Sequence, residues 1–372
     1  MSAEARLSLA LGLMSGTSLD GVDAALLRTD GRAAVRPDAW LTRDYEPELR
    51  ARLHETLGGR GDVAAVARDV TRAHAAAVAA LLGHAGIAAG EVDVIGFHGH
   101  TIAHRPDEGL TWQIGDGALL AELTGIDVVC DFRSRDVAAG GEGAPLAPLY
   151  HAALASGLER PLAVLNLGGV ANVTWLGADG ALCAFDTGPG NALLDDWVRR
   201  HTGAPFDAEG ALARTGAVDS GVLARLLAHP YFERPPPKSL DRDSFAGTVE
   251  GLSPADGAAT LAAFSATAVG KACAHLPAPP KRWLVTGGGR HNPILMDNLR
   301  NVLAVPVEAV EAVRWQGDAL EAQAFAYLAV RALKGLAITL PDTTGAPRPL
   351  AGGALYRHDL GPDREPGAAG GP

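Results

Sequence analysis

Two polar turns that are rich in glycine hold the residue types that bind phosphate groups. The first turn follows an apolar run at residues 7–14 and contains Gly16, Ser18 and Asp20, with Asp23 just beyond. Glycine lets backbone N–H groups face outward, hydroxyl groups add donors, and a carboxylate can orient the metal ion that accompanies a phosphate. The same residue types form ordinary hairpin turns, so this turn alone leaves a phosphate site and a plain hairpin equally open.

The second turn repeats the plan of the first about half a chain later. Residues 162–180 contain an apolar strand, a Gly168-Gly169 turn flanked by Asn166 and Asn172, a second apolar strand and an Asp-Gly turn. This self-similarity predicts two like domains, each opening with a hairpin whose turn faces a shared cleft. Two such turns would hold a nucleoside triphosphate from both sides, which is the layout of a kinase.

A carboxylate stands where the next predicted strand of the second half ends. Asp186 follows a strand at 181–185 and precedes the glycine-rich start of a helix predicted at 190–201. Ligands bind at strand ends in open α/β sheets, and a carboxylate there can act as the general base of a phosphoryl transfer. The alternative is that Asp186 only caps the following helix. Its place in the repeated layout favours the catalytic role.

Further polar groups follow the predicted strands of the first half. Arg133 comes just after a short β-branched strand and can bind a carboxylate or a phosphate, although an internal ion-pair network is an equal alternative. The group His98, His100 and His104 has no Cys or acidic ligand at metal spacing. A hydrogen bond from His98 or Thr101 to a polar substrate is therefore favoured over a metal site.

Two features of the second half also have candidate roles. Gly287 and Gly288 follow a strand at 283–286 and open a helix at 293–302, a turn that suits contact with adenine or ribose. Glu321 lies in a helix predicted at 318–335 and either reaches the cleft or faces solvent.

Strands and helices must alternate to position these residues. Each half is predicted to contain a hairpin followed by helices and strands, which requires an α/β fold with mixed sheets flanked by helices. The other predicted elements are helices at 48–57, 62–82 and 119–124, a strand at 92–96 that breaks at Gly99, and strands at 126–130 and 305–310. The predicted divisions are an N-terminal domain at 1–155, a C-terminal domain at 156–340, and a C-terminal segment at 341–372 with a disordered tail.

Composition narrows the classes of partner. The chain has 372 residues, enough for two domains, and is 47% apolar and 20% charged. Its net charge of −11 argues against nucleic acid as a partner, because binding to that backbone needs concentrated Lys and Arg. The three cysteines are isolated and no run of 18 apolar residues occurs, so we expect a cytoplasmic protein with no membrane partner.

Eight segments together resemble the anhydro-N-acetylmuramic acid kinases of bacteria, which belong to the actin-like ATPase and sugar kinase superfamily. The resemblance runs in order over about residues 7–335 and is specific because the segments occur jointly. The segments are GLMSGTSLDGVD (12–23), GFHGHTIAHRP (96–106), WQIGD (112–116), DFRSRDVAAGGEGAPL (131–146), LNLGGVANVT (165–174), DTGPGN (186–191), PPPKS (235–239) and TGGGRHNP (286–293).

The resemblance implies two actin-like, RNase H-like domains with a ligand cleft between them. It implies a kinase that opens the 1,6-anhydro ring of anhydro-N-acetylmuramic acid with water while ATP phosphorylates O6. The product would be N-acetylmuramic acid 6-phosphate, formed during recycling of cell-wall peptidoglycan. Asp186 would be the base that activates the water attacking C1, and Glu321 would assist at the sugar.

The resemblance also assigns the binding residues. ATP and Mg²⁺ are the expected cofactors, with Asp20 as the carboxylate that orients the metal ion, and a homodimer is a possible assembly. The residues expected to bind ATP are Gly16, Thr17, Ser18, Leu19, Asp20, Gly21, Val22, Asp23, Gly168, Gly169, Gly287 and Gly288. The residues expected to bind the sugar are His98, Thr101, Arg133, Asp186 and Asn191.

Two alternative functions stay open on the sequence. One is an ATP-dependent kinase of another sugar on the same fold, which substrate profiling would distinguish. The other is a non-catalytic nucleotide switch like actin or the chaperones, whose ATP turnover would not depend on a sugar. The elaborate segment 131–146 at a strand end favours a small-molecule pocket over the switch.

Overall fold

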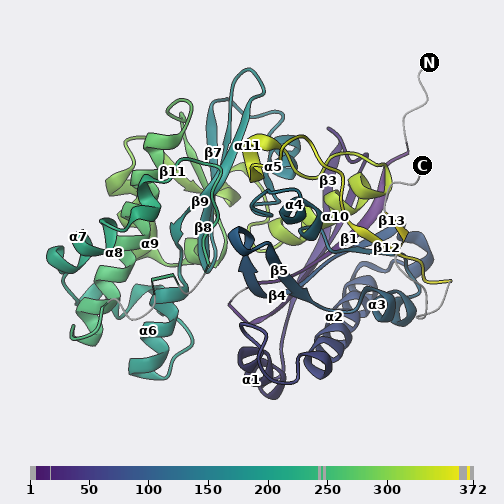
Figure 1. The fold of residues 1–372 in the computed structure, drawn as a ribbon, viewed down its shortest axis with the longest axis horizontal. Helices are drawn as coiled ribbons and strands as arrows, with labels where there is room; N and C mark the ends of the chain where they lie inside the picture. The colour runs from purple at the N-terminus through teal and green to yellow at the C-terminus, as the bar shows by residue number, and fades with distance from the viewer. Residues whose placement is uncertain (1–5, 17, 242–243, 246–248, 360–366, 369–372) are drawn as a thin grey trace. The chain divides into compact units, whose positions relative to one another are not determined.

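The chain folds as an α/β protein with two mixed sheets flanked by helices, which confirms the predicted fold class (Figure 1). The computed structural model describes residues 6–16, 18–241, 244–245, 249–359 and 367–368. Two compact units form: residues 1–158 together with 318–372, and residues 159–317.

The sheet of the first unit combines an antiparallel meander with parallel strands. Its strands are β1 (Ser8–Ser15), β2 (Gly21–Thr29), β3 (Val35–Asp44), β4 (Val94–Arg105), β5 (Leu110–Ile114), β6 (Val128–Cys130), β12 (Ala354–Tyr356) and β13 (Gly367–Ala368). Their order is β13-β12-β6-β4-β1-β2-β3, and β5 pairs with β4. Strands β1, β2 and β3 pair antiparallel, whereas β4 is parallel to β1 and β6 is parallel to β4.

The sheet of the second unit has the same five-stranded pattern. Its strands are β7 (Leu162–Leu167), β8 (Val170–Leu176), β9 (Leu182–Pro189), β10 (Trp283–Thr286) and β11 (Val307–Ala309). Their order is β11-β10-β7-β8-β9. Strands β7, β8 and β9 pair antiparallel, and β10 and β11 continue the sheet in parallel from β7. The internal repeat predicted from the two hairpins is therefore confirmed.

Helices cover both faces of the first sheet. They are α1 (Pro47–Glu55), α2 (Val63–Ala85), α3 (Gly117–Thr124), α4 (Ser134–Ala138), α5 (Pro148–Leu154), α10 (Leu320–Leu333) and α11 (Pro341–Thr344). Leu11 and Leu13 of β1 join the core that also contains Val70 and Leu81 of α2. Because strand residues alternate between faces, Gly12 points the other way, toward α10.

Glycine in the two central strands lets α10 approach the sheet at backbone distance. A Cβ atom at Gly12 would lie 1.7 Å from the carbonyl oxygen of Ala322, and one at Gly96 would lie 2.1 Å from that of Phe325. No side chain fits between the helix and these strands. This packing explains why residues 318–372 belong to the compact unit of the N-terminal half. The predicted C-terminal domain, 156–340, instead grouped this helix with the second half.

Four helices form in the second unit. They are α6 (Ala192–Thr202), α7 (Ser220–Leu227), α8 (Pro254–Ala272) and α9 (Pro293–Val302). Helix α8 begins at the N-cap Ser253, whose side chain accepts from the N–H of Asp256, and Pro254 fits the first turn. Most of α8 is buried, with Phe264 and Val269 in the two apolar cores of the unit.

The predicted hairpins, the strand at 283–286 and the helix at 293–302 are confirmed, but two predicted strand ends are wrong. The strand predicted at 92–96 continues to Arg105 as β4, because Gly99 takes a φ of 72° and the chain then pairs with β5. The strand predicted at 181–185 continues to Pro189, because a register shift opposite Ala171 lets pairing with β8 continue.

Candidate active site

The turn between β1 and β2 is ordered by hydrogen bonds within it. Leu19 has a φ of 60°, and its N–H donates to Gly16 O at 3.2 Å. The Oδ1 atom of Asp20 accepts from Ser18 Oγ at 2.7 Å and from the N–H of Gly21 at 2.9 Å. The predicted ATP contact Thr17 lies outside the described residues. The turn therefore presents an exposed carboxylate, Asp20, beside backbone donors.

A buried polar network lies under this turn. The hydroxyl of Tyr45 donates to Ser15 Oγ at 2.8 Å, and Ser15 Oγ lies 2.9 Å from Nδ1 of His100. The N–H of Tyr45 donates to Asp20 O at 2.9 Å. Burial lowers the pKa of His100 to about 3, so the imidazole is neutral. The network connects the turn to β4 and to the segment that follows β3.

Carboxylates gather near the start of β2. Burial raises the pKa of Asp23 to about 7, with further contributions from the negative charges of Asp20, Glu321 and Asp318, while a hydrogen bond from Thr42 opposes the increase. The predicted catalytic residue Glu321 is half-buried in the first turn of α10. Within the ranges that the structure describes, no three His, Cys, Asp or Glu side chains are placed to hold a metal ion. The cluster thus makes this end of the first unit strongly negative.

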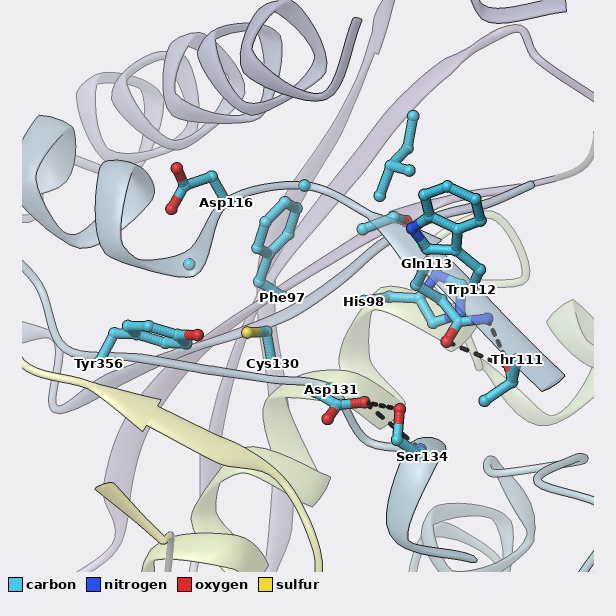
Figure 2. Close-up of a pocket in the computed structure, with 14 residues that line it drawn as sticks. Phe97, His98, Thr111, Trp112, Gln113, Asp116, Cys130, Asp131, Ser134 and Tyr356 are labelled. Carbon is cyan, nitrogen blue, oxygen red and sulfur yellow. Dashed lines mark hydrogen bonds between the residues drawn. The ribbon is translucent and has the colours of Figure 1, made fainter. Parts of the chain in front are cut away.

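A cavity of about 460 Å³ opens beside β5 and the start of α4 in the first unit (Figure 2). Its wall includes His98, Trp112, Gln113, Asp131 and Ser134. Asp131 Oδ1 accepts from both the hydroxyl and the N–H of Ser134, so a carboxylate edges the cavity. The wall combines a partly exposed aromatic ring with hydrogen-bonding groups, which is the lining that a sugar needs.

Two predicted sugar-binding residues, His98 and Arg133, contact each other. Arg133 donates to Nε2 of His98 from Nε at 3.2 Å and from Nη2 at 3.0 Å, and its Nη1 donates to Gly143 O at 2.7 Å. Because arginine only donates, Nε2 must accept, and Nδ1 then donates to Gly99 O at 2.9 Å. Burial and the Arg133 charge hold the pKa of His98 well below its usual range. The internal network that was one interpretation of Arg133 therefore exists.

The third predicted residue of this pocket, Thr101, is bonded to a residue that sequence reasoning missed. Gln113 donates from Nε2 to Thr101 Oγ1 at 3.2 Å and to Thr111 Oγ1 at 2.9 Å. Gln113 lies on β5, which pairs with β4, and it lines the cavity. The segment 112–116 carried part of the family resemblance, so the signal for a functional residue there was present but no role was assigned to it.

Asp186 lies inside β9 in the second unit and is buried, with 6% of its surface exposed. Its N–H donates to Lys238 O at 3.0 Å, and its Oδ2 atom accepts from the N–H of Leu240 at 2.9 Å. Helix α6 begins five residues later with Asn191 as its N-cap residue, so the alternative that Asp186 caps this helix is wrong. The carboxylate is instead held by the segment 231–240.

Three glycine-rich segments of the second unit meet. The N–H of Gly190 donates to Gly169 O at 2.9 Å, and that of Asn191 donates to Gly168 O at 2.8 Å. Gly287 has a φ of 81°, and a Cβ atom there would lie 2.4 Å from Oδ1 of Asn166. That Oδ1 atom is buried and lacks a hydrogen-bond partner among the described residues. The predicted residues of this unit thus surround a polar atom that can still accept a hydrogen bond.

An ion pair that sequence reasoning missed holds the turn at Gly287. Arg290 donates to Glu311 Oε1 from Nε at 3.0 Å and from Nη2 at 2.8 Å, and its Nη1 donates to Gly287 O at 3.0 Å. The Arg290 side chain is only 3% exposed. Because this arginine is fixed at both ends, it orders the turn rather than waiting for a ligand.

Within each unit, the structure brings most of the predicted residues into groups. In the first unit, Gly16 to Asp23 form one group with Glu321 near it, and His98, Thr101 and Arg133 form another. In the second unit, Gly168 and Gly169 meet Asn191, and the turn at Gly287 adjoins β7. No helix in the described part of the chain is long and apolar enough to cross a bilayer.

Comparison with known proteins adds a family. A family model described as anhydro-N-acetylmuramic acid kinase matches residues 8–358. The anhydro-N-acetylmuramic acid kinase of Paramagnetospirillum magneticum is 60% identical over 349 residues, which cover 93% of this chain and 98% of that protein. The protein of the same description from Rhodospirillum rubrum is 58% identical and covers 93% of this chain and 94% of its own.

Solved structures show a weaker likeness. An activator of the 2-hydroxyisocaproyl-CoA dehydratase from Clostridium difficile, with bound ADPNP, has a TM-score of 0.46 and 11% identity, over 87% of this chain and 96% of that chain. A ROK family glucokinase from Streptomyces griseus, in complex with glucose and AMPPNP, has a TM-score of 0.43 and 15% identity, over 86% and 99%. These values support no inference about function.

Proposed function

The chain belongs to the anhydro-N-acetylmuramic acid kinase family and is a phosphotransferase, and we propose that it couples hydrolytic ring opening of the anhydro sugar to phosphoryl transfer from ATP. In this reaction the oxygen of a water molecule bonds to C1 of the sugar and the C1–O6 bond breaks. The freed O6 bonds to the γ-phosphorus of ATP, and the bond between that phosphorus and the bridging oxygen breaks. The products are N-acetylmuramic acid 6-phosphate and ADP.

Asp186 is the base that takes the proton of the attacking water. The observation that carries this proposal is a carboxylate that is buried yet held in one orientation, with Oδ2 bonded to the N–H of Leu240. A base must be fixed within hydrogen-bond reach of the proton that it removes, and a backbone donor provides that fixation without supplying a competing acid.

The sugar lies in the cavity beside β5, according to this proposal. Arg133 supplies a fixed cation because His98 and Gly143 hold its guanidinium, and Gln113 and Thr101 supply neutral donors and acceptors. Trp112 is 41% exposed on the cavity wall and offers an aromatic face to a pyranose ring. Asn191 is the proposed sugar contact of the second unit, and Glu321 is proposed to assist at the sugar.

ATP contacts the glycine-rich turns of both units, a proposal that the sequence repeat supports. In the first unit the turn from Gly16 to Asp23 surrounds phosphate oxygens with backbone donors. In the second unit Gly168, Gly169, Gly287 and Gly288 allow close approach of the nucleotide to backbone, and Asn166 Oδ1 accepts a hydrogen bond.

Mg²⁺ fits the first of these turns. Mg²⁺ is usually bound by one or two carboxylates together with phosphate oxygens and water, so a single exposed carboxylate beside the phosphates is sufficient. Asp20 supplies that carboxylate, and the raised pKa of Asp23 reflects a negative field that a cation would relieve. Bound there, the ion would neutralise charge on the β- and γ-phosphates.

Two further expectations are part of the proposal. A cytoplasmic location follows from the use of ATP as phosphoryl donor and agrees with three cysteines that form no pair. A homodimer is the assembly to test, by light scattering of the purified chain with and without ligands.

The test of this function is a product analysis in ¹⁸O-labelled water. With ATP and 1,6-anhydro-N-acetylmuramic acid, we expect a product heavier than the sugar by one phosphoryl group and one water, with a single ¹⁸O at C1. Consumption of ATP without any sugar would instead support the nucleotide switch. Faster turnover of a different sugar than of the anhydro sugar would support the alternative kinase.

A further inference from the structure

A buried lysine without an assigned role lies next to Asp186. Lys238 follows three prolines and is 1% exposed. Its ammonium group donates to Tyr231 O at 3.1 Å and lies over two aromatic rings, 4.7 Å from the centroid of Tyr231 and 5.7 Å from that of Phe185. An ammonium group is costly to bury, so its retention at this place calls for a compensating interaction.

The segment that carries Lys238 holds Asp186 at three atoms. The N–H of Asp186 donates to Lys238 O at 3.0 Å, Oδ2 of Asp186 accepts from the N–H of Leu240 at 2.9 Å, and Asp186 O accepts from the hydroxyl of Tyr231 at 2.5 Å. Lys238 is therefore part of the scaffold that sets the position of this carboxylate. It is also the buried cation of that scaffold.

The charges around Lys238 come from three elements. Glu233 and Arg234 belong to its own segment, Asp186 to β9 and Lys271 to α8. Burial is the main cause that lowers the pKa of Lys238 to about 8, and the charge of Asp186 acts in the opposite direction, as does that of Glu233. The attraction between Lys238 and Asp186 is reciprocal, so the ammonium group stabilises the ionised form of the carboxyl.

We propose that Lys238 is a positioning residue that keeps Asp186 ionised and correctly placed to accept a proton from the attacking water. This inference rests on the proposed role of Asp186 as the base. A purely structural role would need only a side chain of similar volume over the two rings. A charge at this place does more, because it favours the deprotonated base and leaves the proton-accepting oxygen available at lower pH.

The test compares the pH dependence of kcat/KM for the sugar in variants that separate charge from volume. Lys238→Gln keeps a donor for Tyr231 O without the charge, Lys238→Met keeps the volume, and Lys238→Arg keeps the charge. In the two neutral variants the acid limb of kcat/KM should move up by about one pH unit, whereas Lys238→Arg should keep the wild-type limb.

Matched controls isolate this charge. Lys271→Met removes the neighbouring cation, which is exposed and paired with Glu233, and should leave the acid limb in place. Tyr231→Phe removes the hydroxyl that bonds to Asp186 O and should lower kcat by the same factor at every pH. An unmoved acid limb in the neutral variants overturns the inference, as does a result in which only Lys238→Arg folds, since that assigns Lys238 to stability.

Asp186→Asn distinguishes failure of this inference from failure of the proposed function. If Asp186→Asn keeps turnover, the base lies elsewhere and both proposals fail. If Asp186→Asn is inactive while the acid limb ignores Lys238, only the inference about Lys238 fails.

Discussion

Arg133 donates two hydrogen bonds to Nε2 of His98, at 3.2 and 3.0 Å, and thereby fixes the proton of this histidine on Nδ1. The two residues are 35 positions apart, on β4 and at the start of α4. Both were predicted to bind the sugar directly. The contact assigns them different tasks: Arg133 faces the ligand, and His98 holds Arg133.

Removal of this support should weaken sugar binding selectively. In His98→Ala the guanidinium loses an acceptor, and hydrogen bonds to charged groups contribute about 1.5–3 kcal/mol, so KM for the sugar should rise roughly tenfold to a hundredfold. His98→Gln places an amide oxygen near the Nε2 position and should lose less. Steady-state kinetics measure both constants, and an equal rise in KM for ATP would contradict a role confined to the sugar.

The close packing of α10 on the sheet predicts a severe cost for one added methyl group. Gly12→Ala would place Cβ 1.7 Å from Ala322 O, so strand and helix must separate, and we expect a loss of at least about 3 kcal/mol in unfolding free energy. Gly83→Ala in α2 is the matched control, since no atom lies within 4 Å of its Cβ position. It should stabilise the helix by about 0.5–1 kcal/mol. Urea unfolding measures both, and equal effects would contradict the packing.

Asp23 makes stability depend on pH in a defined direction. Its pKa in the folded protein is about 7, above the ordinary value of 3.8, because of burial and nearby carboxylates. The folded state therefore binds this proton more tightly than the unfolded state, and the resulting stability is present below about pH 4 and is lost as the pH rises through 7.

Asp23→Asn removes this dependence. At pH 8 and without ligands, its Tm should exceed that of the wild type by at least about 2 °C, and the difference should vanish near pH 4. The same variant should bind ATP with Mg²⁺ more weakly than the wild type. Differential scanning fluorimetry across this pH range measures the effect, and a constant difference in Tm at all pH values would show that another group titrates.

Much of the fold was predictable because local signals agreed with the final structure. The hairpin around Gly16, the strand before Gly287 and the helix after Asn292 have apolar runs bounded by turn or capping residues. Strand β3 was missed because it is an edge strand without a buried face, so its side chains do not alternate between apolar and polar. Helix α8 was missed because it is buried all round and shows no polar stripe.

The site was predictable residue by residue, but its contacts were not. Turn chemistry pointed to Asp20 and strand position pointed to Asp186, whereas the pairing of His98 with Arg133 joins segments that only the folded sheet brings together. Gly99 was interpreted as the end of a strand, although its positive φ continues β4 into the hairpin that carries Gln113. The place of Lys238 beside Asp186 depends on a loop of more than 40 residues after β9, whose path no local pattern specifies.

The most direct test of the account is a single-turnover measurement on Asp186→Asn beside the wild type, with ATP and 1,6-anhydro-N-acetylmuramic acid. Asp196→Asn, which changes a carboxylate paired with Arg199 on α6, is the matched control and should keep wild-type turnover. We predict that Asp186→Asn loses about a thousandfold in the rate of ring opening while an ATP analogue and the sugar still bind. Ring opening within tenfold of the wild-type rate would contradict the assignment of Asp186 as the base.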